Sequence, residues 1–226
     1  MIGVFDSGVG GFIAIDALRK TAPDLNICFF ADRKNAPYGT KTLREITELS
    51  KRNIEKLVSL GAEKILIACC TASAAYPYLS EDEKQICVPI INLGAKRAVE
   101  ISKNGRIGVI ATERTVKERA FFKAVSEISS DTSVFELEAQ NFVTLVENGA
   151  RDGELNERDK LAIEEKLSPF HDKKIDTLIL GCTHFPHIEK EIQKVLGVRT
   201  VNPAFEGALE IVKDAHLSEE GRTVYI

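Results

Sequence analysis

Two cysteines of this chain each follow a short apolar segment and begin a helix-like one. Cys69 follows residues 64–68, and Cys182 follows residues 177–181. Both segments are rich in branched aliphatic residues, which is typical of buried parallel strands. Ligands bind at the carboxyl edge of such sheets, and a helix amino terminus there favours the thiolate that a reactive cysteine needs. Two thiols so placed predict an acid and a base on opposite sides of one substrate.

Two ionisable residues accompany these thiols. Asp6 follows the apolar segment 2–5, so it either caps the next helix or takes part in catalysis. His184 comes two residues after Cys182, where an imidazole can exchange a proton near neutral pH, although a histidine in a first helical turn is often a cap or a surface residue. Both residues are candidates for moving the protons of the thiols.

Several other motifs have both a structural and a functional interpretation. The connection 31–39 contains Pro37 and Gly39, which would fix its shape around an exposed Tyr38, either as a turn or as a substrate contact. Residues 5–11 are glycine-rich, but Ile13 occupies the place of the third glycine of a dinucleotide-binding motif. We therefore expect no dinucleotide there.

A metal site is the remaining alternative for the cysteines. Cys69 and Cys70 are adjacent, and Cys182 with His184 would complete a set of soft ligands. Neither motif has the two-residue gap that lets both sulfurs of one turn reach one ion. We expect no metal and no other cofactor.

Strand-like and helix-like segments alternate along the whole chain, which predicts a parallel, doubly wound α/β fold. A cysteine motif ends a strand in each half, so we expect two pseudo-symmetric lobes with the active site in the cleft between them. We place the first lobe at residues 1–92 plus 204–226, with Asp6 and Cys69, and the second at 93–203, with Cys182 and His184. The expected strands are 2–5, 27–31, 64–68, 88–91, 106–111, 133–137, 177–181 and 198–201, and the expected helices are 40–60, 96–102, 115–128, 157–167 and 184–196.

Composition restricts the environment and the partners of the protein. The 226 residues are 44% hydrophobic, enough for a core, and the net charge of −4 offers no basic field for nucleic acid or an anionic membrane. Five cysteines, an odd number without paired spacing, fit a reducing cytoplasm. No leader-like or membrane-spanning stretch is present in the sequence, so we expect a cytoplasmic protein with a small-molecule substrate.

Together these motifs resemble the glutamate racemases of the cofactor-independent aspartate/glutamate racemase superfamily. The resemblance covers essentially the whole chain, and His184 favours glutamate over aspartate as substrate. It implies an isomerase with two α/β domains, a homodimer, and a supply of D-glutamate for peptidoglycan synthesis and so for cell shape. The motifs that carry it are 5–11, 37–39, 68–73, 108–112 with 115–116, 145–147 and 180–186.

The resemblance also implies roles for particular residues. Cys69 acts on D-glutamate and Cys182 on L-glutamate. Each cysteine reacts as a thiolate in one direction and as a thiol in the other. Asp6 near Cys69 and His184 near Cys182 are the implied proton acceptors. The expected substrate-binding residues are Ser7, Pro37, Tyr38, Gly39, Cys70, Thr71, Thr115, Glu147 and Thr183.

One position departs from the family pattern. Cys70 stands where these enzymes normally carry an asparagine that binds substrate. A weak sulfur donor replaces an amide, and losing such a contact to a charged substrate costs roughly ten- to hundredfold in affinity or rate. Two alternatives therefore remain: a racemase, isomerase or decarboxylase for aspartate or another small acid, or a catalytically weakened homologue that binds an amino acid for regulation.

Overall fold

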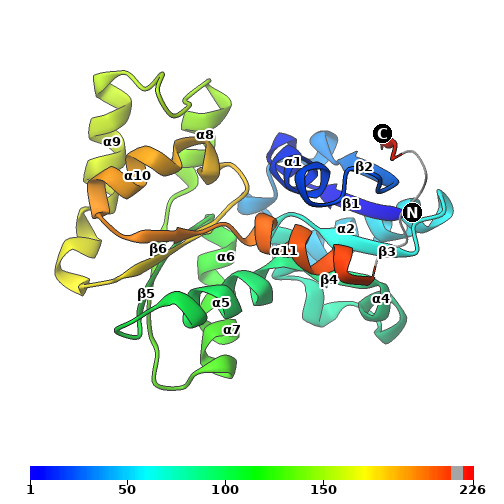
Figure 1. The fold of residues 1–226 in the computed structure, drawn as a ribbon, viewed down its shortest axis with the longest axis horizontal. Helices are drawn as coiled ribbons and strands as arrows, with labels where there is room; N and C mark the ends of the chain where they lie inside the picture. Colours follow the sequence, from blue (N-terminus) through cyan, green and yellow to red (C-terminus); the bar gives the residue numbers. More distant parts are fainter. Residues whose placement is uncertain (215–220) are drawn as a thin grey trace.

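The computed structural model describes residues 1–214 and 221–226 and has two α/β lobes side by side (Figure 1). The sheet of the first lobe has five parallel strands in the order β4-β3-β1-β2-β9. The central strand β1 is buried along its whole length, which explains its continuous apolar sequence. The strands are β1 (Ile2–Asp6), β2 (Ile27–Ala31), β3 (Lys64–Ile67), β4 (Cys87–Pro89) and β9 (Thr223–Tyr225).

The sheet of the second lobe is also parallel, with the order β6-β5-β7-β8. Read from the other edge, this order is 8-7-5-6, which repeats the order 4-3-1-2 of the first lobe. The two lobes are therefore pseudo-symmetric, and β3 corresponds to β7. The strands are β5 (Arg106–Ala111), β6 (Ser133–Glu138), β7 (Thr177–Gly181) and β8 (Arg199–Val201).

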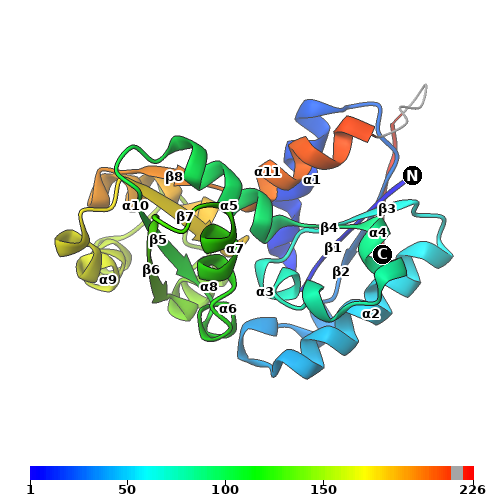
Figure 2. The ribbon, with the colours of Figure 1, turned by 90° about the horizontal axis from the view of Figure 1, so that it is seen from below.

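Helices cover both faces of each sheet, as a doubly wound fold requires. In the first lobe α1 and α11 lie on one face and α2 on the other (Figure 2). In the second lobe α5 and α7 lie on one face, and α8, α9 and α10 on the other (Figure 1). The α-helices are α1 (Phe12–Thr21), α2 (Leu43–Ser59), α3 (Cys70–Ser73), α4 (Glu81–Ile86), α5 (Ile90–Ile101), α6 (Glu113–Lys117), α7 (Ala120–Ile128), α8 (Gln140–Glu147), α9 (Glu157–Leu167), α10 (Glu189–Leu196) and α11 (Pro203–Ile211).

Short 3-10 helices occupy many of the connections. Two of them, η2 and η3, follow β2 in succession, and η6 follows β7. Their bounds are η1 (Val9–Gly11), η2 (Arg33–Asn35), η3 (Tyr38–Thr40), η4 (Tyr76–Tyr78), η5 (Ser168–Lys173), η6 (Phe185–Ile188) and η7 (Val212–Asp214).

The lobes are joined by α5 and α11, which pack against each other; α11 also packs on α1, and α5 on α7 (Figure 2). One hydrophobic cluster runs through this junction and includes Val4 of the first sheet and Val109 of the second. Burial of this shared core holds the two sheets together. The division of the chain at residues 92/93 and 203/204 stays a prediction.

Several predicted elements have different bounds in the structure. The strand expected at 88–91 ends at Pro89, and α5 begins at Ile90 rather than at residue 96. The helix expected at 115–128 is two helices, α6 and α7, interrupted at Arg119, whose φ of 54° is left-handed. A single residue in that conformation ends the regular hydrogen bonding of a helix.

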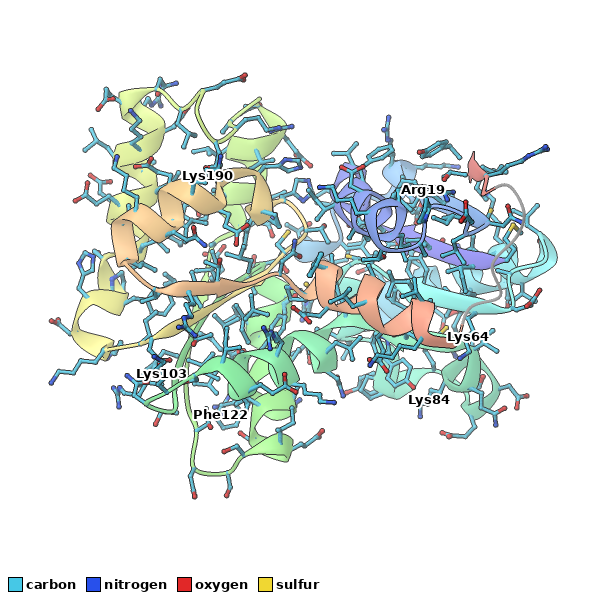
Figure 3. All side chains as sticks on the ribbon, in the orientation of Figure 1. Arg19, Lys64, Lys84, Lys103, Phe122 and Lys190 are labelled. Atoms are coloured by element: carbon cyan, nitrogen blue, oxygen red, sulfur yellow. The ribbon has the colours of Figure 1, made fainter. Side chains whose placement is uncertain are left out.

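Strand β9 had no counterpart in the sequence interpretation. It extends the sheet beyond β2, and Arg19 of α1 holds it there by donating from Nε to Thr223 Oγ1 at 3.0 Å. Arg19 also donates to the carbonyl oxygens of Pro23 and Leu25, and it is labelled on α1 in Figure 3. Within the described residues, none of the helices has the length and apolar character needed to cross a membrane.

Candidate active site

A cavity between the lobes is lined by residues from both sheets' carboxyl edges. It brings together Cys69, at the end of β3, and Cys182, at the end of β7. The lining residues are Ser7, Gly8, Ala36, Pro37, Tyr38, Gly39, Cys69, Cys70, Thr71, Thr112, Gln140, Val143, Glu147, Cys182, Thr183 and His184. The correspondence of β3 with β7 thus places two thiols at one cavity from opposite lobes.

Cys69 is the N-cap residue of α3. Its Sγ accepts a hydrogen bond from the backbone N–H of Ala72 at 3.5 Å and donates one to Ser7 Oγ at 3.4 Å. Burial, with a smaller contribution from the negative charge of Asp6, raises the pKa of the Cys69 thiol to about 11. The thiol is therefore protonated at neutral pH and needs a proton acceptor to react as a thiolate.

Asp6, at the end of β1, is fully buried. Its Oδ1 accepts from the backbone N–H of Gly8 at 2.7 Å, and its Oδ2 accepts from Thr183 Oγ1 at 3.0 Å. Burial raises the pKa of Asp6 to about 7, although these hydrogen bonds lower it. A carboxyl group with such a pKa can take or give a proton at physiological pH.

Cys182 has a histidine as its partner. Its Sγ lies 3.6 Å from His184 Nδ1, and burial raises the pKa of the thiol well above its ordinary value. Burial, and then the charge of Arg151, lower the pKa of His184 to about 4. The imidazole is therefore neutral at physiological pH, and in one of its two tautomers the unprotonated Nδ1 faces Cys182. Its Nε2 lies 3.5 Å from Glu147 Oε1.

Three threonine hydroxyls meet where the lobes face each other. Thr71 Oγ1 lies 2.9 Å from Thr112 Oγ1, which lies 2.9 Å from Thr115 Oγ1, and Thr115 donates to Thr71 at 3.4 Å. Thr71 comes from the first lobe and the other two from the second. Hydroxyls can donate to a carboxylate as well as to each other, so this group can hold an anionic substrate between the lobes.

The tyrosine of the 37–39 motif is buried, so the expectation of an exposed Tyr38 was wrong. Its hydroxyl donates to Asp32 Oδ2 at 2.6 Å and accepts from Asn53 Nδ2 at 3.0 Å. The ring packs in the core of the first lobe. Burial of the ring is favourable because its apolar part leaves water while its hydroxyl keeps polar partners. The buried ring fixes the shape of the loop around Pro37 and Gly39.

The cavity contains all of the predicted site residues except two. Asp6 and Thr115 lie behind its lining, in contact with Thr183 and Thr112 respectively. Cys70 lines the cavity and is buried, and its burial raises the pKa of the thiol well above the ordinary value. It therefore stands there as a neutral thiol.

Five lining residues were not among the expected site residues: Gly8, Ala36, Thr112, Gln140 and Val143. Gln140 and Val143 precede Glu147 by seven and four residues on α8. Helical periodicity counted backwards from Glu147 would have found them.

All five cysteines are free and buried. In the part of the chain that the structure describes, no three histidine, cysteine, aspartate or glutamate side chains are grouped so that they could hold a metal ion. The protonated cysteines and the neutral histidine are instead suited to proton transfer.

Comparison with known proteins identifies the class to which this fold and site belong. Residues 14–210 match the family model described as Asp/Glu/Hydantoin racemase, and the chain belongs to that family. It is 41% identical over 206 residues to the glutamate racemase of Desulforudis audaxviator, covering 90% of this chain and 74% of the relative. It is 39% identical over 208 residues to that of Limosilactobacillus reuteri, covering 91% and 76%.

Solved structures of glutamate racemases share the fold. The RacE1 isoform from Bacillus anthracis superposes with a TM-score of 0.92 at 30% identity, covering 100% of this chain and 87% of the other. The enzyme from Francisella tularensis, solved in complex with D-glutamate, gives 0.90 at 31% identity, covering 99% and 87%. An aspartate racemase from Picrophilus torridus, 16% identical with a TM-score of 0.68, shares the fold alone.

Proposed function

We propose that this chain is a glutamate racemase that interconverts L- and D-glutamate by proton transfer between two thiols and the α-carbon. One observation carries the proposal: Cys69 and Cys182 end corresponding strands of two pseudo-symmetric lobes and line the same cavity. Racemisation requires a base on one face of the α-carbon and an acid on the other, and this arrangement provides both. The similarity to glutamate racemases supports glutamate as the substrate.

In each direction one sulfur removes the α-proton and the other returns a proton to the opposite face. With D-glutamate bound, the Cys69 thiolate takes the α-proton as the C–H bond breaks, and the Cys182 thiol donates its own proton to the other face. The reverse reaction exchanges the two roles. No electron leaves the substrate, so the reaction needs no oxidant or reductant.

Both thiols are protonated in the resting enzyme, so each needs an acceptor. Asp6, with its pKa of about 7, is placed near Cys69, whose own pKa it influences. His184 Nδ1 lies 3.6 Å from Cys182 Sγ. The imidazole is neutral at neutral pH, so Nδ1 can accept a proton when the single ring proton is on Nε2. Each half-site thus pairs a thiol with a group able to take its proton.

The polar lining supplies the contacts that hold an amino acid. Ser7 and Thr183 lie beside Cys69 and Asp6, where their oxygens can accept from the substrate ammonium. The hydroxyls of Thr71 and Thr112 can donate to a carboxylate, with Thr115 behind them. The remaining expected contacts, from Pro37, Tyr38, Gly39, Cys70 and Glu147, come from the cavity wall.

We further infer the cellular role from the family. D-Glutamate made in the cytoplasm would supply peptidoglycan synthesis and thereby cell shape, and the enzyme would act as a homodimer without a cofactor. Its ligand is a small amino acid rather than nucleic acid or a membrane, which agrees with the net charge of −4.

The test is proton NMR of the purified protein with L-glutamate in deuterated water, with circular dichroism of the same sample. Loss of the α-proton signal together with decaying optical activity is expected. Cys69→Ser and Cys182→Ser should each abolish racemisation, because serine is a far weaker acid than cysteine. Normal interconversion by Cys182→Ser would refute the two-thiol mechanism.

A second candidate is favoured by Cys70, which replaces a side-chain amide of the resembled family. A binding homologue with weakened catalysis would show neither NMR exchange nor loss of optical activity, while glutamate would still raise its thermal stability. Faster turnover of aspartate than of glutamate would instead indicate a related racemase for another small acid.

A further inference from the structure

Helix α8 presents one stripe of side chains to the cavity: Gln140, Val143 and Glu147. These positions, spaced by three and four residues, lie on one face of a helix. Glu147 is at the end near His184, 3.5 Å from its Nε2. Gln140, two turns earlier and so about 10 Å away along the axis, is at the end near Gly39 of the opposite lobe.

Gln140 closes the cavity against that lobe. A Cβ atom built on Gly39 would lie 2.3 Å from Gln140 Oε1 and 2.9 Å from Thr112 Cβ, so only a glycine lets the loop approach this closely. The loop is also held from the second lobe by Arg114, whose Nε donates to the carbonyl oxygen of Lys41 at 2.6 Å. The Gln140 carboxamide is thus placed between the two lobes.

The start of α8 is fixed as well. The backbone N–H of Gln140 donates to Glu138 Oε1, and the other oxygen of Glu138 lies 3.1 Å from Lys166 Nζ. The backbone of Gln140 is therefore anchored, and its side chain is aimed at the cavity by the helix.

The Oε1 atom of Gln140 is buried and finds no hydrogen-bond partner among the described residues. Buried polar atoms are nearly always paired in folded proteins, so an unpaired one on a side chain that lines the cavity is a candidate contact for a ligand. Rotation of the carboxamide by half a turn exchanges its oxygen for its NH₂ group, which presents two donors at the same place. Donors there suit a carboxylate.

We propose that Gln140 is a specificity-determining residue, whose carboxamide binds the side-chain carboxylate of glutamate. The inference rests on the proposed function. The α-carbon must lie between Cys69 and Cys182, and the Cys182 end of α8 is occupied by Glu147 and His184. The other end, with Gln140, is left for the distal part of the substrate. An amino acid with a shorter side chain would not reach it.

The charge of the distal carboxylate does not change during the reaction, whereas the α-carboxylate gains electron density as the α-proton leaves. A contact to the distal group is therefore made equally in ground and transition states, and its loss raises KM while kcat is kept. A contact to the α-carboxylate would lower kcat instead.

The experiment compares racemisation of glutamate by the wild type, Gln140→Leu, Gln140→Glu and the control Asn141→Ala, an exposed neighbour on the same helix. Because a hydrogen bond to a charged group corresponds to roughly tenfold or more in affinity, Gln140→Leu should raise KM about tenfold with kcat within about twofold. Gln140→Glu should raise KM further at alkaline pH, by repulsion, and improve as the pH is lowered and the new carboxyl becomes a donor. Asn141→Ala should match the wild type.

The proposal is overturned if KM of Gln140→Leu stays within about twofold of the wild type, or if kcat falls more than KM rises. Thermal melting of each variant shows whether the fold is kept. If the wild type itself failed to racemise glutamate, the proposed function would fail separately, and the same comparison would be made on the Kd of D-glutamate by calorimetry. An unchanged Kd in Gln140→Leu would then overturn the role of Gln140.

Discussion

Thr183 of the second lobe donates a hydrogen bond from Oγ1 to Asp6 Oδ2 of the first lobe at 3.0 Å. The lobes therefore contact each other at Asp6, the proposed proton acceptor for Cys69. Gly10 packs against the same threonine, since a Cβ atom at this position would lie 2.2 Å from Thr183 Oγ1. The lack of a side chain at Gly10 therefore sets how closely the two lobes approach each other at Thr183.

Gly10→Ala should therefore separate Thr183 from Asp6. The added methyl group displaces the threonine, and we expect a destabilisation of about 1–3 kcal/mol from overpacking together with a loss of racemase activity. Gly8→Ala is the matched control for stability, because a Cβ atom at Gly8 meets no other atom within 4 Å; it is not a control for activity, because Gly8 lines the cavity. Denaturant unfolding of both variants and steady-state kinetics of Gly10→Ala test this, and an equal loss of stability at the two glycines would contradict it.

Thr183→Val should shift the pH dependence of catalysis. The hydrogen bond from Thr183 lowers the pKa of Asp6, and its loss should raise that pKa above about 7. The acidic limb of kcat/KM for the direction that begins at Cys69 should then move to higher pH, whereas Thr183→Ser, which keeps the hydroxyl, should leave the limb in place. A limb that does not move in the valine variant would show that Asp6 is not the acceptor for Cys69.

Asp6 also makes stability depend on pH. Its pKa is about 7 in the folded protein against 3.8 for an ordinary aspartate. The stability that protonated Asp6 contributes is therefore fully present below pH 3.8 and is lost as the pH rises through about 7. Between about pH 4 and pH 8 the free energy of unfolding of the wild type should fall by roughly 4 kcal/mol relative to Asp6→Asn. Urea titrations of both proteins across this range measure the difference, and parallel pH profiles would refute it.

The sequence predicted most of the fold because buried parallel strands are short apolar runs that stand out from their surroundings. Strands β2, β5 and β7 have the predicted bounds. The start of α5 was missed because Ile90 and Ile91 continue the apolar run of β4 directly, and periodicity cannot divide such a run between a strand and a helix. β9 was missed because its pairing depends on distant contacts such as the one from Arg19.

The candidate site was predictable where a residue type itself carries chemistry, as for the two cysteines at strand ends. Residues that matter through their surroundings were harder to find. Tyr38 was expected in solvent, but its buried partner Asp32 is visible only in the structure. Gln140 has no reactive group, and only its unpaired oxygen against Gly39 of the other lobe distinguishes it.

Cys70→Asn should strengthen substrate binding. Cys70 lines the cavity as a buried, neutral thiol, and the charges of Cys182, Cys69 and Asp6 would each oppose its ionisation. It therefore offers the substrate only a weak S–H donor, whereas a carboxamide offers two N–H donors and an acceptor. A new hydrogen bond to a charged group corresponds to roughly tenfold or more in affinity, so kcat/KM for glutamate should rise by about that factor. Steady-state kinetics in both directions test this, with thermal melting as the control for packing. An unchanged or lower kcat/KM in a variant that melts like the wild type would show that the pocket has adapted to the thiol.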